Sequence, residues 1–345
     1  MPLPPELLRA DLALDAVQRR LDASHHLNPM DEVEARARFL RGGPVRFRYH
    51  PLRDADELLR ACDAVRPPEH HPLGRELVDA TVELRHAVLA LRDRTSAAFD
   101  ALNAVSGWYD EVGVPPDFQP AVRAPDDSVV PIEQVAQTFR NVLAERGLNR
   151  WTVRQDPVMS ARVVVDAPRA EVRLNPRATI SETDLRALVA HELDVHVARA
   201  EAGRRQPLRL FGNGLAGSLA TEEGLALHAE AAAAGLPAGA ADRLALLAAA
   251  ARRAKEQGFT GLYRGLEPLI GANGAWTTCL RLKRGLADPE APGVYAKDRV
   301  YWIGWCTVTR WIQQGGERRW LGVGKVGTQH PVAAWIAAGW LNPPG

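Results

Sequence analysis

Long hydrophobic runs, paired cysteines and an excess of one charge are all missing from this sequence of 345 residues. No stretch approaches the roughly 18 uninterrupted apolar residues of a membrane helix. The N-terminus has no basic segment followed by an apolar run, so we expect no secretory signal. The 43 Lys and Arg residues nearly cancel the 42 Asp and Glu residues. This balance argues against a nucleic-acid binder that neutralises phosphates and against attraction to an anionic membrane.

Cysteine is used sparingly. Cys62, Cys279 and Cys306 lie far apart, form no CxxC pair and leave one thiol over in any disulfide scheme. Such usage is typical of a reducing compartment, in which thiols serve as small core residues. We therefore predict a cytoplasmic protein. The apolar fraction of 46% and the charged fraction of 25% are those of an ordinary globular chain.

The hydrophobic pattern divides the chain in two. Residues 1–111 are predicted to form an N-terminal helical region, and residues 112–345 a second domain. Apolar residues recur at helical spacing in the first region over 4–24, 55–65 and 74–102. Residues 112–130 contain four prolines and no period, so they mark the boundary.

The second region opens with an amphipathic helix over 131–147. Three short runs of β-forming residues follow, at 151–155, 161–166 and 170–175. Turn-rich segments separate these runs, which favours a small antiparallel sheet. Ser181 is then expected to cap a helix that extends to Gly203. The remainder is mostly helical, so the predicted fold class is α+β and predominantly helical.

The helix predicted over 181–203 carries His191, Glu192 and His196. Two imidazoles on one helix commonly hold Zn²⁺, and a carboxylate beside the first can act as a general base. The usual spacing is HExxH, but here the second histidine comes one residue later. At about 100° per residue, these two side chains diverge by roughly 140° on a regular helix. The pair can converge only if the helix widens, so we predict a π-bulge between them. The alternative is that the two histidines are unrelated and do not share a metal ion.

A zinc site with an open position needs a third protein ligand. Glu222 and Glu223 open the next predicted helix, and they point about 100° apart, so only one can reach the metal. Asp194, close to His191, is a further candidate, although an outer acceptor or solvent-facing role is favoured. Gly224 has no side chain and is expected to let this helix pack closely against the histidine-bearing helix.

The stretch HELDVHVARAEAGRRQPLRLFGNGLAGSLATEEGLALHAE, residues 191–230, resembles the bacterial flavohemoglobin expression-modulating QEGLA-motif proteins (domain of unknown function 1704). These are related to microtubule-associated tyrosine carboxypeptidases. The resemblance includes HExxxH, Arg199, the QPL segment and the EGLA run, and extends over about 130–345. Glu222 stands where the motif's name has Gln. The segment 286–296, LADPEAPGVYA, replaces a short glycine run.

This resemblance implies a zincin-like metallopeptidase core. It implies Zn²⁺ ligands at His191, His196 and Glu223, with Glu192 as the general base. The implied substrate is a peptide or protein C-terminus, from which a carboxypeptidase releases the last residue. The alternatives are a zinc amidase or deacylase that acts on a small molecule, and a non-catalytic regulatory binding protein.

Candidates for substrate binding lie in the matched C-terminal segments. A carboxypeptidase must hold a terminal carboxylate, which calls for Arg or Lys, and an oxyanion needs a donor such as Tyr. The candidates are Arg284, Tyr295, Lys297, Tyr301 and Lys325. Each could equally be an ordinary surface charge or a tyrosine that anchors a helix. The substrate could also add a strand to an edge of the predicted sheet.

Overall fold

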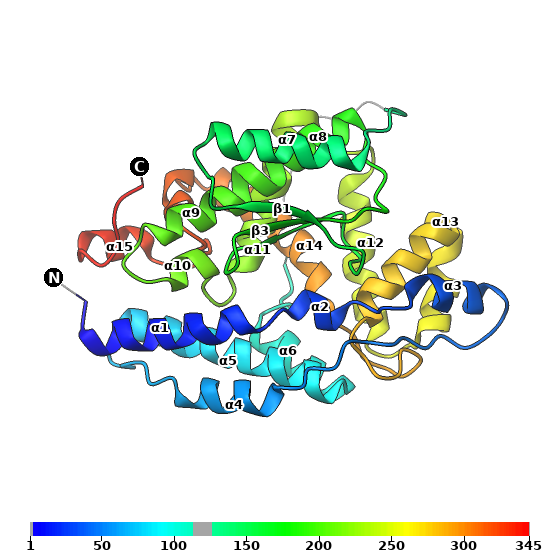
Figure 1. Cartoon of the computed structure of the whole chain (residues 1–345), viewed down its shortest axis with the longest axis horizontal. Helices are drawn as coiled ribbons and strands as arrows, with labels where there is room; N and C mark the ends of the chain where they lie inside the picture. Colours follow the sequence, from blue (N-terminus) through cyan, green and yellow to red (C-terminus); the bar gives the residue numbers. More distant parts are fainter. Residues whose placement is uncertain (1–2, 113–125, 345) are drawn as a thin grey trace.

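The computed structural model describes residues 3–112 and 126–344 (Figure 1). Most of the predicted boundary at 112–130 therefore lies outside the described residues. The N-terminal helices are α1 (Pro5–Arg20), α2 (Ala23–Leu27), α3 (Glu32–Leu40), α4 (Ala55–Ala64), α5 (Pro72–Asp93) and α6 (Ser96–Val105). The later elements begin with α7 (Ile132–Glu145), β1 (Thr152–Gln155), β2 (Val163–Asp166), β3 (Glu171–Leu174), α8 (Glu182–Leu188), the π-helix η1 (Val189–Val197) and α9 (Ala198–Arg204). They continue with α10 (Leu210–Asn213), α11 (Ser218–Ala234), α12 (Ala240–Ala254), α13 (Phe259–Lys283), η2 (Ala296–Asp298), α14 (Arg299–Gln313), η3 (Arg318–Val323) and α15 (Val332–Ala337).

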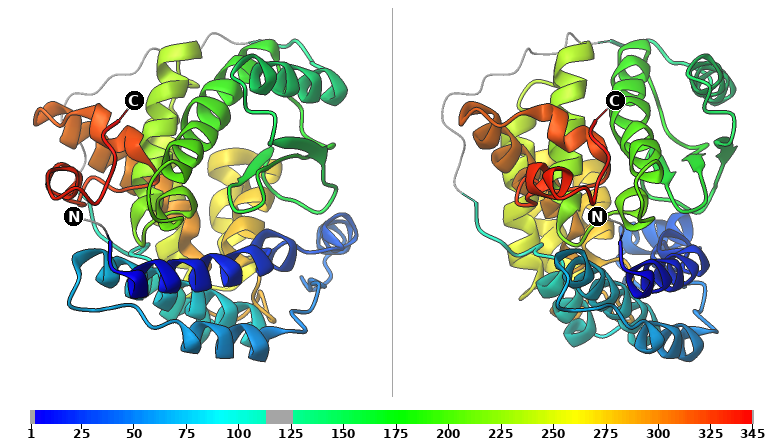
Figure 2. Two further views of the ribbon diagram at one scale, coloured as in Figure 1. Left: turned by 60° about the vertical axis from the view of Figure 1, so that its left-hand side comes forward. Right: turned by 90° about the vertical axis from the view of Figure 1, so that its left-hand side faces the viewer.

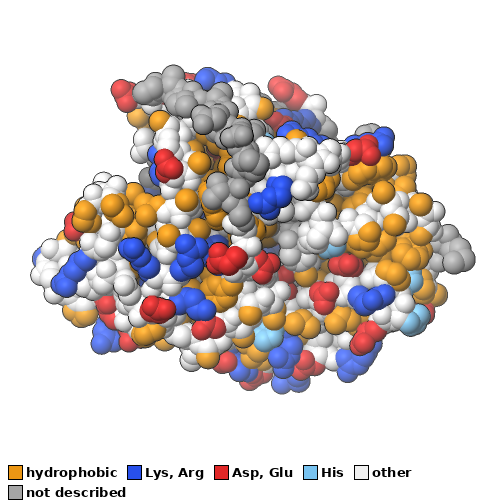
Figure 3. All heavy atoms as spheres, turned by 180° about the vertical axis from the view of Figure 1, so that it is seen from behind, with side chains coloured by type: hydrophobic (Ala, Val, Ile, Leu, Met, Phe, Trp, Pro, Cys, Tyr) orange, Lys and Arg blue, Asp and Glu red, His pale blue; other side chains and the backbone are white. Residues whose placement is uncertain are grey.

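A predominantly helical chain with one small sheet confirms the α+β prediction. None of the helices in the described ranges is long and apolar enough to cross a membrane. Seen from behind, the surface carries acidic and basic side chains side by side, as the balanced composition predicts (Figure 3).

Helices α1, α4, α5 and α6 lie together beneath the sheet and the later helices, whereas α3 lies beside α13 (Figures 1 and 2). One hydrophobic cluster joins the two regions, with Leu58 and Phe99 from the first and Trp276 and Val300 from the second. The helix predicted over 74–102 is two helices, because Arg94 adopts a left-handed conformation (φ 51°). Thr95 then caps α6, its hydroxyl accepting from the Ala98 N–H at 3.2 Å.

The prediction of an antiparallel sheet was wrong, because the observed sheet is mixed. Its order is β1-β3-β2, with β2 and β3 antiparallel but β1 and β3 parallel. The central strand β3 buries Val172 and Leu174 completely. After β3, Asn175 donates to the carbonyls of Met159 and Ala161 at 3.1 and 3.2 Å. These bonds hold the loop that connects β1 to β2 across the end of β3. Strand β2 therefore pairs with the side of β3 opposite β1 and forms an edge of the sheet.

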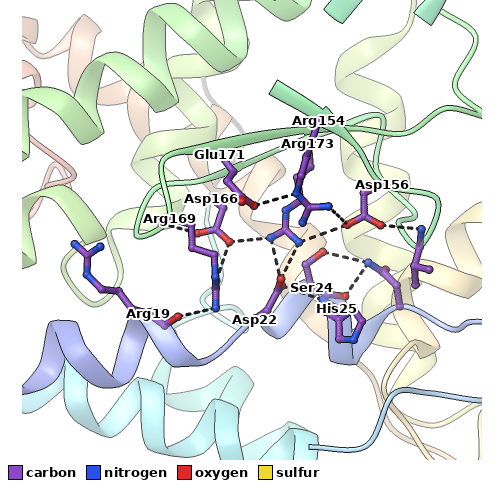
Figure 4. Close-up of polar contacts among 12 residues, drawn as sticks. Arg19, Asp22, Ser24, His25, Arg154, Asp156, Asp166, Arg169, Glu171 and Arg173 are labelled. Carbon is purple, nitrogen blue, oxygen red and sulfur yellow. Dashed lines mark hydrogen bonds and ion pairs between the residues drawn. The ribbon is translucent and has the colours of Figure 1, made fainter. Parts of the chain in front are cut away.

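A buried ion network fixes the N-terminal helices under the sheet (Figure 4). Arg173 of β3 contacts Asp22 at 2.9 Å and Asp166 at 2.8 Å. Arg169 donates to the Arg19 carbonyl at the end of α1 at 2.7 Å. Because Arg173 is buried between these carboxylates, replacing it would leave their charges uncompensated, which is costly. The network therefore sets the position of α1 and α2 relative to β2.

Helices α11 and α14 cross in close contact at two glycines. A Cβ on Gly304 would lie 1.9 Å from the Ala220 carbonyl oxygen, and one on Gly224 would lie 2.3 Å from the Gly304 carbonyl oxygen. Helix α11 does pack against the histidine-bearing π-helix as predicted, but the prediction that Gly224 makes this contact possible was wrong. Its close approach is to α14, a contact between segments far apart in sequence.

We expect Gly304→Ala to lower the free energy of unfolding by about 1–3 kcal/mol or more, because overpacked side chains must push the backbones apart. Chemical denaturation measures this. Gly261→Ala is the matched control, since a Cβ there meets only Gln257 at 4.0 Å and alanine favours the helix. Equal stability of the Gly304→Ala variant and wild type would contradict the tight crossing.

Candidate metal centre

The histidine-bearing helix is widened as predicted. Ser181 caps α8, its hydroxyl accepting from the Asp184 N–H at 3.0 Å. The helix then continues as a π-helix over Val189–Val197 before α9 resumes the α form. A π-turn spans one more residue than an α-turn, so His191 and His196 lie on one face. Their ring centroids are 4.9 Å apart.

Three ligand atoms converge at this face. The Glu223 Oε2 atom lies 3.4 Å from His191 Nε2 and 3.6 Å from His196 Nε2. The ligand atoms of the three side chains all lie within 4.8 Å of one another, and all three residues are buried. Bonds of about 2.0–2.1 Å place tetrahedral ligand atoms about 3.4 Å apart. The observed spacings therefore fit a zinc ion.

The chemistry of the Glu223 carboxylate also fits a cation. Its Oε2 atom is buried and accepts no hydrogen bond from the residues that the structure describes. A buried carboxylate oxygen without a partner costs free energy. A cation held between Glu223 and the two imidazoles removes that cost.

Carboxylates behind the two histidines orient their rings. His191 Nδ1 lies 2.7 Å from Glu230 Oε1, and His196 Nδ1 lies 2.9 Å from Glu222 Oε1. When each Nδ1 donates to its carboxylate, the neutral imidazole has its Nε2 lone pair directed at the shared point. Sequence reasoning missed Glu230. Its position two helical turns after Glu223 on α11 was the available signal.

The neighbouring acids Glu222 and Glu223 have separate roles. Glu222 points away from the shared point and contacts Arg199 Nη1 at 2.7 Å and Lys325 Nζ at 2.8 Å. Burial alone would raise the pKa of Glu222, but Lys325 and Arg199 hold it well below its usual range. Arg199 also donates to the Leu321 and Val326 carbonyls at 3.0 and 2.6 Å. These contacts fix the segment that carries Lys325.

Asp194, the further candidate ligand, lies away from the three converging side chains. Asp194 is exposed and pairs with Arg146 at 2.5 Å. The ring of His228 stacks on Trp305 with centroids 5.0 Å apart, and its Nε2 lies 3.0 Å from the Thr309 hydroxyl. Burial lowers the pKa of His228 to about 4. It is a neutral packing residue.

A cavity of about 210 Å³ opens onto the converging atoms. Its lining includes His191, Glu192 and the edge strand β2. All five predicted substrate-binding residues also line it, namely Arg284, Tyr295, Lys297, Tyr301 and Lys325. The structure thus brings all five predicted substrate-binding residues to the cavity beside the proposed metal ligands.

The family described as microtubule-associated tyrosine carboxypeptidase matches residues 118–345. The chain belongs to this family. Human microtubule-associated tyrosine carboxypeptidase 1 is 30% identical over 161 residues, which are 45% of this chain and 34% of that protein. The mouse protein of the same name is 28% identical over 185 residues, which are 51% of this chain and 39% of that protein. The chain thus aligns with only about a third of the length of these relatives.

The part that matches the tyrosine carboxypeptidase family contains all three candidate metal ligands. Within the cavity, the cations differ in their availability. Arg281 contacts Asp298 at 2.8 Å, and Arg284 lies over the Tyr295 ring at 5.2 Å. Lys325 is held by Glu222. Lys297 forms no ion pair within the described ranges, and burial lowers its pKa. It is therefore the cation best placed to receive an anion.

Proposed function

We propose that this protein is a zinc-dependent carboxypeptidase that releases the last residue of a peptide or protein. The observation that carries the proposal is the convergence of the His191 and His196 Nε2 atoms on Glu223 Oε2. Membership of the tyrosine carboxypeptidase family supports it. The zincin-like core is part of the same proposal. We also propose a cytoplasmic location, in keeping with three free, buried cysteines.

In this proposal His191, His196 and Glu223 hold zinc. When bound, zinc supplies the Lewis acidity that makes water a nucleophile near neutral pH. Glu192 follows His191 directly and lines the cavity. Burial raises the pKa of Glu192, which suits a general base that takes a proton from water and later gives it to the leaving amine.

Two cavity residues are assigned to the substrate. Lys297 receives the terminal carboxylate, because its ammonium group has no other ion pair in the part of the chain described. Tyr301 donates to the scissile carbonyl oxygen as negative charge develops on it. Burial raises the pKa of Tyr301 above that of an ordinary tyrosine, so its hydroxyl remains a proton donor.

The free edge of β2 gives the peptide backbone a place to bind. Val164 pairs with Arg173 on β3, and the Arg162 carbonyl accepts from Asn175 N–H at 2.9 Å. In an antiparallel pair the backbone groups alternate in direction, so those of Val163 and Val165 point away from β3. Both residues line the cavity. An extended peptide can therefore add a strand here.

The proposal predicts one zinc ion per chain and peptide cleavage that a chelator abolishes and added zinc restores. Elemental analysis after dialysis and mass spectrometry of peptide mixtures measure both. His191→Ala should lose the metal. Glu230→Gln should weaken zinc binding by about 10–100-fold, because Glu230 orients a ligand, while the exposed Glu182→Gln should not. Full zinc retention by His191→Ala would overturn the assignment.

A further inference from the structure

The connection between α13 and η2, residues 284–295, carries Tyr295 to the proposed active site and leads directly into Lys297. It contains neither helix nor strand. Irregular connections usually run over the surface and move more than the elements they join. Here the last part is buried instead, with Val294 at 0% and Tyr295 at 6% exposure. Particular contacts must therefore hold this connection in place.

The lysine just before the connection, Lys283, is completely buried. Its ammonium group donates to four backbone carbonyl groups. The acceptors are those of Ala254, Gln257, Ala291 and Gly293, whose oxygens lie 2.9, 2.5, 2.9 and 2.7 Å from Nζ. An ammonium group has three protons, so every proton has a partner. A buried charge is tolerated only when its hydrogen bonds are made, so Lys283 fixes these carbonyl groups relative to one another.

The four carbonyl groups belong to two different parts of the chain. Ala254 is the last residue of α12, and Gln257 follows it within one turn. The carbonyl groups at the end of a helix lack helical partners and carry partial negative charge, so they favour a cation. The other two acceptors lie in the connection 284–295, where the Gly293 N–H also donates to the Ala254 carbonyl at 3.1 Å. Lys283 thus ties the connection to α12 just before it enters the cavity.

A second buried side chain, Asn103 of α6, holds the end of the connection. Its Nδ2 donates to the Val294 carbonyl at 2.8 Å, and its Oδ1 accepts from the Ala296 N–H at 3.0 Å. These two bonds lie on either side of Tyr295. Together with the buried ammonium group, they fix the backbone immediately before Lys297.

We propose that Lys283, together with Asn103, is a positioning residue that keeps Lys297 where the terminal carboxylate of the substrate binds. The inference rests on the proposed carboxypeptidase function. Without the ammonium group the connection samples other arrangements, and the substrate must select the one in which Lys297 faces it. The apparent affinity then falls by the fraction of molecules in that arrangement, while the bound complex is unchanged. Lys283 therefore acts on KM rather than kcat, and only for substrates with a free carboxylate.

The test replaces Lys283 by methionine, which retains much of the aliphatic stem without the charge. The KM of the zinc-loaded protein for a free-acid peptide should rise by about tenfold or more, since misplacing a binding group by about 1 Å can cost about 100-fold. Its kcat, and cleavage of the C-terminal amide, should stay within about twofold of wild type. Burial lowers the pKa of Lys283 to about 8, so assays at pH 7 compare methionine with the charged form.

Lys255→Met is the matched control for this variant. Lys255 lies at the same end of α12, but it is exposed and its ammonium group lies over the Tyr109 ring at 4.1 Å. All values should stay at those of wild type. If Lys283→Met fails to fold, Asn103→Asp takes its place, because it keeps the acceptor and replaces the donor to the Val294 carbonyl by an oxygen. An unchanged KM for the free acid in either variant would overturn the inference.

A double-mutant cycle shows whether Lys283 acts through Lys297. Two residues that act through one another are not additive, so Lys283→Met should change the KM of the Lys297→Met protein by less than about twofold. A general loss of structure would instead raise KM by the same factor in both backgrounds, or slow the acid and the amide equally. Either result would contradict a positioning role.

Peptide affinity in the Glu192→Gln background, measured by calorimetry, separates this inference from the proposed function. Affinity for the free acid that depends on Lys283, in a protein whose wild type hydrolyses no peptide, supports the positioning role and refutes the peptidase. Chelator-sensitive hydrolysis with a wild-type KM in Lys283→Met supports the peptidase and refutes the positioning role.

Discussion

Replacement of Glu192 by glutamine is expected to lower peptide hydrolysis by about 10²–10⁴-fold, the usual contribution of a positioned general base. Glutamine has the same shape but cannot take a proton. Glu192 is buried in the cavity wall directly after His191. Its carboxylate is not among the three groups that converge on the proposed zinc position. Zinc content should therefore stay at the wild-type level while turnover falls.

The comparison requires rate and metal content on the same samples. Glu182→Gln makes the same chemical change at an exposed site on the helix just before the π-turn, and both quantities should stay at wild-type values. A Glu192→Gln protein with zinc and full turnover would show that another group takes the proton. Loss of zinc together with activity would show that Glu192 supports the metal rather than the reaction.

Local features of the candidate metal centre could be predicted from the sequence because they depend on residues close together in the chain. The cap at Ser181 and the two histidines lie on one predicted helix. Since His191 and His196 cannot converge on a regular α-helix, the spacing predicted a widened turn, and the π-helix confirms it. The choice between Glu222 and Glu223 did not follow from helix geometry alone. It came from the family resemblance.

Features that depend on distant segments could not be predicted. Strands β1 and β3 pair in parallel, and Asn175 holds the loop between β1 and β2 across the end of β3. The spacing of apolar residues within a strand does not show which strands pair with one another. Gly224 was recognised as a close-contact residue, but its partner Gly304 lies on another helix.

Substitution of Lys297 by methionine is expected to remove the preference for a free C-terminal carboxylate. Methionine retains much of the aliphatic stem and its packing but carries no charge. Truncating one partner of a buried charge pair costs about 2–5 kcal/mol, which corresponds to roughly 30- to 5,000-fold in kcat/KM. Wild-type protein should therefore cleave a free-acid peptide faster than its C-terminal amide by a factor in this range.

The variant separates Lys297 from the other cations, because it changes the acid-to-amide ratio and not merely the rate. Lys297→Met should cleave the acid about as slowly as the amide, since neither then finds a cation at that position. Lys255→Met is the matched control, because Lys255 is exposed and lies over the Tyr109 ring at 4.1 Å, away from the cavity lining. Equal cleavage of acid and amide by the wild type would indicate an endopeptidase or amidase. If Lys297→Met kept the wild-type ratio, Arg284 or Lys325 would have to bind the carboxylate, and Lys325 could do so only by giving up its 2.8 Å contact with Glu222.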